Sequence, residues 1–308
     1  MHKRPVWFVP DGSFVFMNEI IKEYLEWKGT YAPRASLNYR IWLNRLVEVC
    51  GEKALHEYDV SDYAKYHQWL RGRYCPWTVQ FAIVVIKNFL QFCKTQNYNC
   101  LSPTLVKLPR AIAKSHRAIT EDEFHLIVSV IPSFEFRILR DLIMIRMLWD
   151  TGVRVSELTD LDTSQISEGK RSTVIQTKKN GKKRIIMWSE ETHGLLMKYL
   201  PLRLSLEKSH NASALFIGFK KGRGWSMRIN TRSIQRIVEY YVNRAGIKSR
   251  ISPHSFRHGW AHKRRDLNAP LSFIQRGLGH VSPVSTFVYE QYCDTEFEKN
   301  ANSYLKTA

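Results

Sequence analysis

Four short groups of residues in the second half of the chain carry side chains suited to chemistry on a phosphate. The first is Arg154-Val155-Ser156-Glu157, and the second is His254-Ser255-Phe256-Arg257-His258. The third contains His280, and the fourth ends at Tyr289. On a helix, residues three apart share a face, so the first histidine and the arginine of the second group can reach one phosphate together. The order of these groups predicts a single phosphate-handling site.

Breaking a phosphodiester places negative charge on the non-bridging oxygens of the transition state. Arginine guanidinium groups stabilise that charge well, because each offers a rigid fork of N–H donors. A tyrosine hydroxyl can attack in line and form a covalent phosphotyrosine, which divides one reaction into two steps. The link conserves the bond energy, so rejoining needs no ATP. The departing oxygen needs a proton, and a lysine can supply it.

These residues resemble the signature of the tyrosine recombinase (phage integrase) family, which is Arg, Lys, His-x-x-Arg, His or Trp, and then Tyr. The resemblance covers about residues 119–292. It implies a site-specific recombinase that cleaves and rejoins double-stranded DNA at specific sites through a 3′-phosphotyrosine. It further implies that four protomers act on two DNA sites, with no cofactor and no metal ion.

The resemblance assigns catalytic roles to Arg154, His254, Arg257, His280 and Tyr289. Glu157 matches an acidic position that orients the site in the family. We expect His258 to support the site by packing. Tyr292, Tyr240 and Tyr241 are rival nucleophiles. The nine residues from His280 to the nucleophile favour Tyr289.

A β-hairpin is expected to carry the catalytic lysine. Two β-rich runs, 172–177 and 184–188, flank a lysine-rich turn that contains Asn180-Gly181, a strong hairpin signal. The segment Lys179–Arg184 resembles the family's Lys-x-x-Lys-x-Arg form, so we assign Lys179 as the general acid. The competing lysines of the same turn are Lys178, Lys182 and Lys183. Met187 departs from the family, in which a proline is common.

A zinc site is the main alternative for the histidine-rich segment. His254, His258, His262 and Asp266 are spaced by four residues and would form one stripe on a helix. Arg257 would then lie beside the metal, and no cysteine is near in the sequence. The pattern therefore favours phosphate chemistry over a metal site.

The first hundred residues must form helices that support this site. Apolar spacing predicts helices over 17–28, 35–50 and 78–96. A further helix is expected to run to Leu70, with Ser61 as its N-cap. This half is similar to the family's core-binding domain, a SAM-like helical bundle that binds DNA. We therefore expect a core-binding domain at 1–108, a basic linker at 109–118 and a catalytic domain at 119–308.

The catalytic domain is predicted to be mixed but mostly helical. Thr120 and Glu123 form a capping-box pattern at a helix start. A long helix is expected over 135–150, ended by Gly152, with a new helix starting near Arg154. After Ser189 we expect helices again, apart from a glycine-rich loop at 218–224. The overall prediction is a mainly α protein with one small antiparallel sheet.

Composition agrees with a nucleic-acid partner. The 308 residues include 47 Lys and Arg against 28 Asp and Glu, a formal net charge of +19. Such a surplus favours a polyanion, and DNA phosphates are a common one. No apolar run approaches the roughly 18 residues of a membrane span, and five scattered cysteines fit a reducing compartment, so we expect a cytoplasmic protein without a membrane partner. The expected DNA contacts are Arg34, Arg40, Arg45, Lys87, Lys114, Arg117 and Lys182.

Two other functions share part of this evidence. A DNA-binding regulator would explain the charge and the helices, but not the ordered catalytic residues. A type IB topoisomerase would share the nucleophile and the cationic clamp. The size of the chain and its N-terminal bundle favour a recombinase over both.

Overall fold

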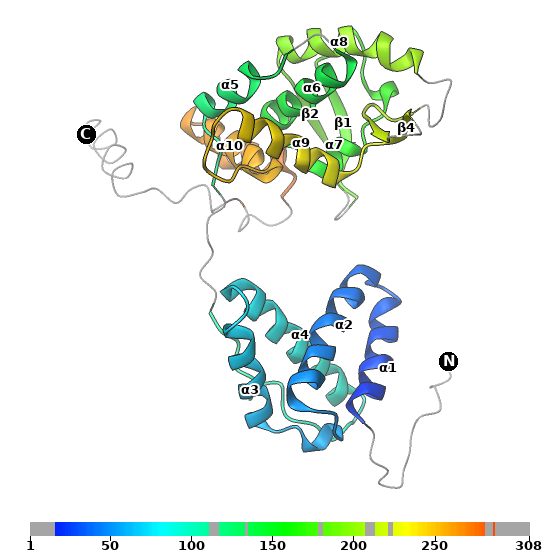
Figure 1. Cartoon of the computed structure of the whole chain (residues 1–308), viewed down its shortest axis with the longest axis vertical. Helices are drawn as coiled ribbons and strands as arrows, with labels where there is room; N and C mark the ends of the chain where they lie inside the picture. The colour runs from blue at the N-terminus through cyan, green and yellow to red at the C-terminus, as the bar shows by residue number, and fades with distance from the viewer. Residues whose placement is uncertain are drawn as a thin grey trace, which may run out of the picture. The chain divides into compact units, whose positions relative to one another are not determined.

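The chain forms two compact units, residues 1–114 and residues 115–308 (Figure 1). The computed structural model describes residues 16–110, 117–132, 135–177, 181–206, 213–220, 224–280 and Thr286. Each unit is described by itself. None of the helices in these ranges combines the length and the apolar character that a membrane crossing requires.

Within residues 16–110, the N-terminal unit is a bundle of four α-helices, as predicted. They are α1 (Met17–Gly29), α2 (Pro33–Cys50), α3 (Val60–Arg71) and α4 (Pro76–Thr95). Helix α4 is buried on most of its sides, from Val79 to Cys93, and packs against the other three. Prolines at the first positions of α2 and α4 suit helix starts, because the missing N–H is not needed there.

One helix start differs from the prediction. Helix α3 is capped by Asp59 and not by Ser61. One Asp59 carboxylate oxygen accepts the backbone N–H groups of Ser61 (2.8 Å) and Asp62 (3.1 Å). The Asp62 side chain accepts the Asp59 N–H in return (3.0 Å). The aspartate thus satisfies two free amides of the first turn, which a serine inside that turn cannot do.

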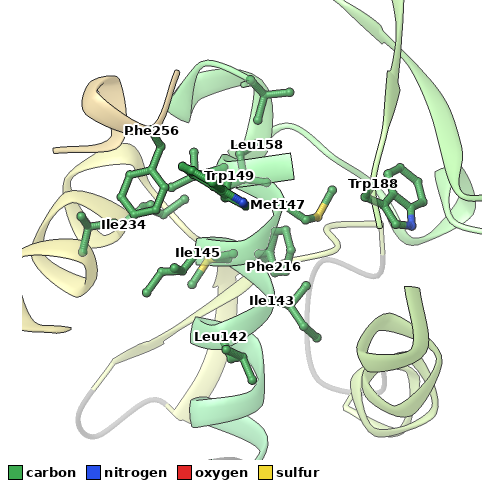
Figure 2. Close-up of a cluster of buried hydrophobic side chains, with 14 of the residues drawn as sticks. Leu142, Ile143, Ile145, Met147, Trp149, Leu158, Trp188, Phe216, Ile234 and Phe256 are labelled. Carbon is green, nitrogen blue, oxygen red and sulfur yellow. The ribbon is translucent and has the colours of Figure 1, made fainter. Parts of the chain in front are cut away.

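The catalytic unit is built around α6 (Phe136–Thr151). This helix is buried along most of its length and packs against α5 (Glu121–Ser129), α8 (Glu190–Ser205), α9 (Thr231–Arg244) and α10 (Pro253–Asp266). Figure 2 shows side chains of this core, among them Ile145 of α6 with Ile234 and Phe256. A helix that is apolar on all sides is typical of the centre of a domain.

The predicted start of α5 and the predicted end of α6 are both confirmed. Thr120 caps α5, with its hydroxyl accepting the Glu123 N–H (3.2 Å) and the Glu123 carboxylate accepting the Thr120 N–H (3.0 Å). Gly152 ends α6 in the left-handed conformation, with φ of 60°. Arg154 is then the N-cap residue of the short helix α7 (Val155–Thr159). The chain therefore turns sharply just before Arg154.

The predicted hairpin consists of β1 (Ser172–Gln176) and β2 (Lys183–Met187), which pair antiparallel with Val174 opposite Ile185. A second hairpin, β3 (Ile217–Lys220) and β4 (Gly224–Arg228), replaces the loop expected at 218–224. That expectation was wrong because two glycines and short strands hide the β pattern. Core contacts hold this hairpin, since the Arg140 side chain donates to the Ile217 carbonyl (2.7 Å).

Trp260 of α10 is a wedge that fixes the ends of two helices. A Cβ atom on Gly152, after α6, or on Gly277, in α11 (Leu271–Leu278), would overlap the Trp260 indole. The indole N–H donates to the Asp150 carbonyl (2.8 Å), and the Arg264 guanidinium lies 4.5 Å over the ring. The two glycines therefore let the turn before Arg154 and the turn before His280 approach one aromatic ring.

We predict that Gly277→Ala destabilises the protein by about 1–3 kcal/mol, because the added methyl overpacks the Trp260 contact. The control is Gly194→Ala in α8, where a Cβ meets nothing within 4 Å. That change should stabilise by about 0.5–1 kcal/mol, as alanine does in a helix. Urea unfolding measures both, and equal effects of the two substitutions would contradict the wedge.

Candidate active site

Arg257 is held at the junction of three helices. The side chain comes from α10 and is buried, and its guanidinium donates to the carbonyls of Gly152 (2.7 Å) and Leu278 (2.5 Å). Both carbonyls lie at helix ends, where backbone acceptors lack partners within the helix. Arg257 therefore joins the end of α6 to the end of α11, as well as carrying a positive charge.

Arg154 is anchored at its backbone and at its side chain by one carboxylate. Glu157 accepts the Arg154 N–H (2.8 Å) and an Nη1 hydrogen bond from the same residue (3.0 Å). The Arg154 side chain is 35% exposed, whereas that of Glu157 is 1% exposed. The guanidinium is thus held by the buried Glu157 carboxylate while part of it faces solvent. This arrangement suits a group that binds a phosphate.

A second arginine, Arg184 of β2, binds the same carboxylate. It donates from Nη1 and Nη2 to the two Glu157 oxygens (3.0 and 2.9 Å), and from Nε to the Gly277 carbonyl (2.8 Å). Sequence reasoning missed this residue. Its signal was the last position of the Lys-x-x-Lys-x-Arg form, which was used only to choose a lysine.

Glu157 remains ionised despite its burial. Burial raises the pKa of its carboxyl, but the hydrogen bonds and charge of Arg184, followed by those of Arg154, outweigh this and hold the pKa below its ordinary value. The Glu157 carboxylate is thus a charged bridge between two arginines. This contact agrees with the predicted role of Glu157 in orienting the site.

His280 lies beside the same group of cations. It follows Gly279, which has φ of 63°, and its Nδ1 is 2.8 Å from the Thr286 hydroxyl. Burial is the largest cause of a lowered pKa at His280, followed by the positive charges of Arg257, Arg154 and Arg184, and together they bring this pKa to about 4. His280 is therefore neutral at pH 7, and a bound phosphate would raise its pKa again.

His254 and His258 form an edge-to-face (T-shaped) pair on α10. Their ring centroids are 4.6 Å apart, with an interplanar angle of 88°. His254 is exposed in the first turn, whereas His258 is buried beneath it. This arrangement agrees with a supporting role for His258 and leaves the His254 ring accessible.

A hollow of about 250 Å³ opens beside His280. Its lining includes the positively charged residues Lys182, Lys183, Arg184 and Arg276. Arg184 is buried in its wall, and the two lysines are exposed. A concave surface with this charge fits an anionic group such as a DNA phosphate. Two of the competing hairpin lysines, Lys182 and Lys183, therefore line the same hollow as His280.

Several predicted residues lie outside the described residues. They are Lys114, Lys178, Lys179, Tyr289 and Tyr292. The other rival tyrosines are on α9, where Tyr240 is exposed and Tyr241 is buried. Burial raises the pKa of Tyr241 to about 12, which disfavours it as a nucleophile.

The predicted DNA-binding residues have diverse surroundings. Arg34 and Arg40 are exposed on α2. The Arg45 guanidinium lies 4.8 Å over the Trp42 ring, and Arg117 pairs with Glu123 (2.6 Å). Lys87 donates its ammonium hydrogens to the carbonyls of Pro103 (2.8 Å) and Val106 (2.9 Å). Lys87 thus fastens the segment after α4, and its contact with DNA stays a prediction.

The zinc alternative gains no support from the geometry. Across the described ranges, no three His, Cys, Asp or Glu side chains are grouped so that they could hold a metal ion. The stripe of His254, His258, His262 and Asp266 is included in those ranges.

The catalytic unit places two tethered arginines and a neutral histidine beside a cationic hollow. These groups are suited to phosphoryl transfer. A model of the phage integrase family matches residues 117–296. The tyrosine recombinase XerC of Thermodesulfovibrio yellowstonii is 30% identical over 233 residues, which are 72% of this chain and 73% of that protein. XerC of Syntrophus aciditrophicus is 27% identical over 297 residues, 89% and 93% of the two chains.

Solved structures of tyrosine recombinases are also similar to this chain. The crystal structure of XerA recombinase is 25% identical, with a TM-score of 0.53, and the match covers 94% of this chain and 98% of that one. A post-cleavage complex of XerH with palindromic difH shares the fold at 18% identity, with a TM-score of 0.73 and coverage of 92% and 84%. A lambda integrase tetramer bound to a Holliday junction also shares it, at 13% identity, a TM-score of 0.71 and coverage of 92% and 80%.

The chain therefore belongs to the phage integrase family of tyrosine recombinases, which are enzymes of site-specific DNA recombination. The predicted family, fold class and enzyme class are confirmed. In the part of the chain that the structure describes, two separate two-stranded sheets stand in place of the one small sheet of the prediction.

His280 makes the stability of the protein depend on pH. The unfolded chain binds a proton on this histidine below about pH 6.5, whereas the folded chain does so only near its pKa of about 4. The free energy of unfolding therefore falls as the pH is lowered through this window. We predict that His280→Gln removes roughly 1 kcal/mol of the loss between pH 7 and pH 5.

Urea unfolding at the two pH values measures this difference. His125→Gln, at an exposed position on α5, is the matched control and should keep the wild-type dependence. If His280→Gln lost as much stability as the wild type over this interval, a half-buried His280 that stays neutral in the folded protein would be refuted.

Proposed function

We propose that Tyr289 attacks a DNA phosphate that Arg154, Arg257, His254 and His280 hold. The observation that carries this proposal is the convergence of Arg257, Arg154 and His280 from three separate segments, close enough that the two guanidinium charges lower the pKa of the histidine. Cationic groups fixed in advance stabilise the charge that develops on the non-bridging oxygens. The rigid tethers through Glu157, Gly152 and Leu278 supply that preorganisation.

The reaction is a transfer of the phosphoryl group between two oxygens. The Tyr289 oxygen forms a bond to phosphorus, and the bond from phosphorus to the 5′ oxygen breaks. An imidazole is a common acceptor for a nucleophile's proton, and the exposed His254 is suited to that role. A hairpin lysine gives a proton to the departing 5′ oxygen. Reversal with a new 5′ hydroxyl rejoins the strand.

For the general acid we propose Lys179, with Lys182 as its rival. The family-like spacing supports Lys179, while the lining of the hollow beside His280 supports Lys182. Successive residues of a strand point to opposite faces, so the neighbours Lys178 and Lys179 cannot both be directed into the site.

The proposed substrate is double-stranded DNA that carries specific recombination sites. The net charge of +19 and the DNA-bound state of the XerH and lambda integrase structures support a DNA partner. We propose that residues 1–108 form the core-binding domain, that residues 109–118 link it to the catalytic domain, and that four protomers assemble on two sites. The lambda integrase tetramer supports this last step. A DNA substrate of this kind also favours a cytoplasmic location.

We predict that Tyr289→Phe abolishes the covalent protein–DNA adduct, because phenylalanine lacks the attacking oxygen. Wild-type protein first selects its binding site from a pool of random duplexes. A nicked version of that duplex then traps the adduct, which denaturing gels detect. Tyr292→Phe is the matched control and should retain adduct formation. An adduct with Tyr289→Phe would refute the nucleophile, and relaxation of plasmids of any sequence would indicate a topoisomerase.

We predict that Lys179→Ala slows cleavage by about 10²-fold, as loss of a general acid does. A substrate with sulfur in place of the bridging 5′ oxygen should restore the rate, because a thiolate leaves without being protonated. Lys182→Ala serves as the comparison. Rescue of Lys182→Ala instead of Lys179→Ala would transfer the role to Lys182.

A further inference from the structure

The Glu157 carboxylate has partners at each of its acceptor positions. Its Oε1 accepts from Arg184 Nη1 and Arg154 Nη1, each at 3.0 Å. Its Oε2 accepts from Arg184 Nη2 (2.9 Å) and from the Arg154 backbone N–H (2.8 Å). A carboxylate offers about four such acceptor positions, so the orientation of Glu157 is set by the two arginines together.

Arg184 also fixes the turn that carries His280. Its Nε donates to the Gly277 carbonyl (2.8 Å), and Arg257 donates to the next carbonyl, that of Leu278 (2.5 Å). At the following residue, a Cβ on Gly279 would lie 3.1 Å from Arg184 Cδ. The turn thus packs on the arginine stem and is bound by its guanidinium, which leaves His280 little room to move.

The burial of Arg184 separates it from the residues that touch DNA. Its side chain is 4% exposed, against 35% for Arg154. Three of its donors are directed to Glu157 and Gly277. The planar fork of arginine can serve these acceptors at once, whereas a lysine ammonium is a point donor without that geometry.

We infer that Arg184 is a positioning residue for DNA cleavage, which aims Arg154 through Glu157 and fixes the His280 turn through the Gly277 carbonyl. This inference rests on the proposed function, since Arg154 and His280 must be the groups that hold the phosphate. Arg184 lies on β2, after the lysine turn, and contacts Glu157 of α7 and Gly277 of α11. One side chain thus connects three elements of the site.

The test is the rate of adduct formation by Arg184→Lys on the nicked duplex, at saturating protein. Lysine keeps the charge but loses the fork, so the clamp should be misplaced and the rate should fall by about 10²-fold. Affinity for the intact duplex should stay at the wild-type value. The 5′-thio substrate should not restore the rate, because protonation of the leaving group is not the impaired step.

Arg140→Lys is the matched control. Arg140 is another buried arginine of the same unit, and it donates to the Asp141 carboxylate and to a backbone carbonyl, that of Ile217, in the second hairpin. Its substitution should lower the thermal midpoint while the folded protein cleaves at the wild-type rate. A comparison of the two variants separates a loss of stability from a loss of alignment.

Glu157→Gln is a second test of the contact by which Arg184 positions Arg154. The amide oxygen can still accept from both Nη1 groups, but the amide NH2 cannot accept from Arg184 Nη2 or from the Arg154 backbone N–H, so half of the bridge is lost. If Arg184→Lys is unfolded at the assay temperature, a loss of cleavage by folded Glu157→Gln supports the link. Where both fold, the double variant should cleave no more slowly than the slower single variant, because the two residues act as one unit.

Three results would overturn the inference: Arg184→Lys cleaving within about twofold of wild type, rescue of its rate by the 5′-thio substrate, or independent effects of Arg184→Lys and Glu157→Gln. Each would leave the proposed function intact, provided that wild-type protein forms the adduct and Tyr289→Phe does not. Wild-type protein that forms no adduct would refute the proposed function and the inference with it.

Discussion

The site depends on a buried, ionised carboxylate placed between two arginines. Burial of Glu157 opposes its charge, and the hydrogen bonds of Arg184 and Arg154 more than offset that cost. Removing one partner from such a group typically costs about 3–5 kcal/mol, because an uncompensated charge stays buried. The ion pairs therefore bind α7 to β2 and, through Gly277, to α11. Rigidity in these contacts is what a phosphate clamp needs, since catalytic donors must be aligned before the charge develops.

The rest of the catalytic unit is arranged to keep this alignment. Trp260 fills the space between the end of α6 and α11, which only glycine allows at Gly152 and Gly277. Arg257 then closes the same junction by binding carbonyls at both helix ends. Arg154 follows one of these ends and His280 follows the other, so the two side chains inherit their positions from a single packed core. The turns that carry these two side chains are thus fixed by the helices that precede them.

The sequence predicted those features whose signal is local, and it missed those that depend on contacts distant in the chain. Thr120, Gly152 and the first hairpin were predictable because capping and turn preferences act over a few residues. Asp59 took the place of Ser61 because two possible N-cap residues lie only two residues apart. The role of Arg184 was hidden, because its partners Glu157 and Gly277 lie 27 and 93 residues away. The second hairpin was missed for the same reason, since its stability comes from the core.

The central claim is that one phosphate held by Arg154, Arg257 and His280 is attacked by Tyr289. Mass spectrometry of the trapped adduct, after nuclease and protease digestion, tests it most directly because it locates the modified residue without any substitution. The account predicts a nucleotide attached through its 3′ phosphate to the peptide that contains Tyr289, with fragment ions that assign the added mass to that side chain. Attachment to Tyr292, to Tyr240 or to any residue other than Tyr289 would contradict it.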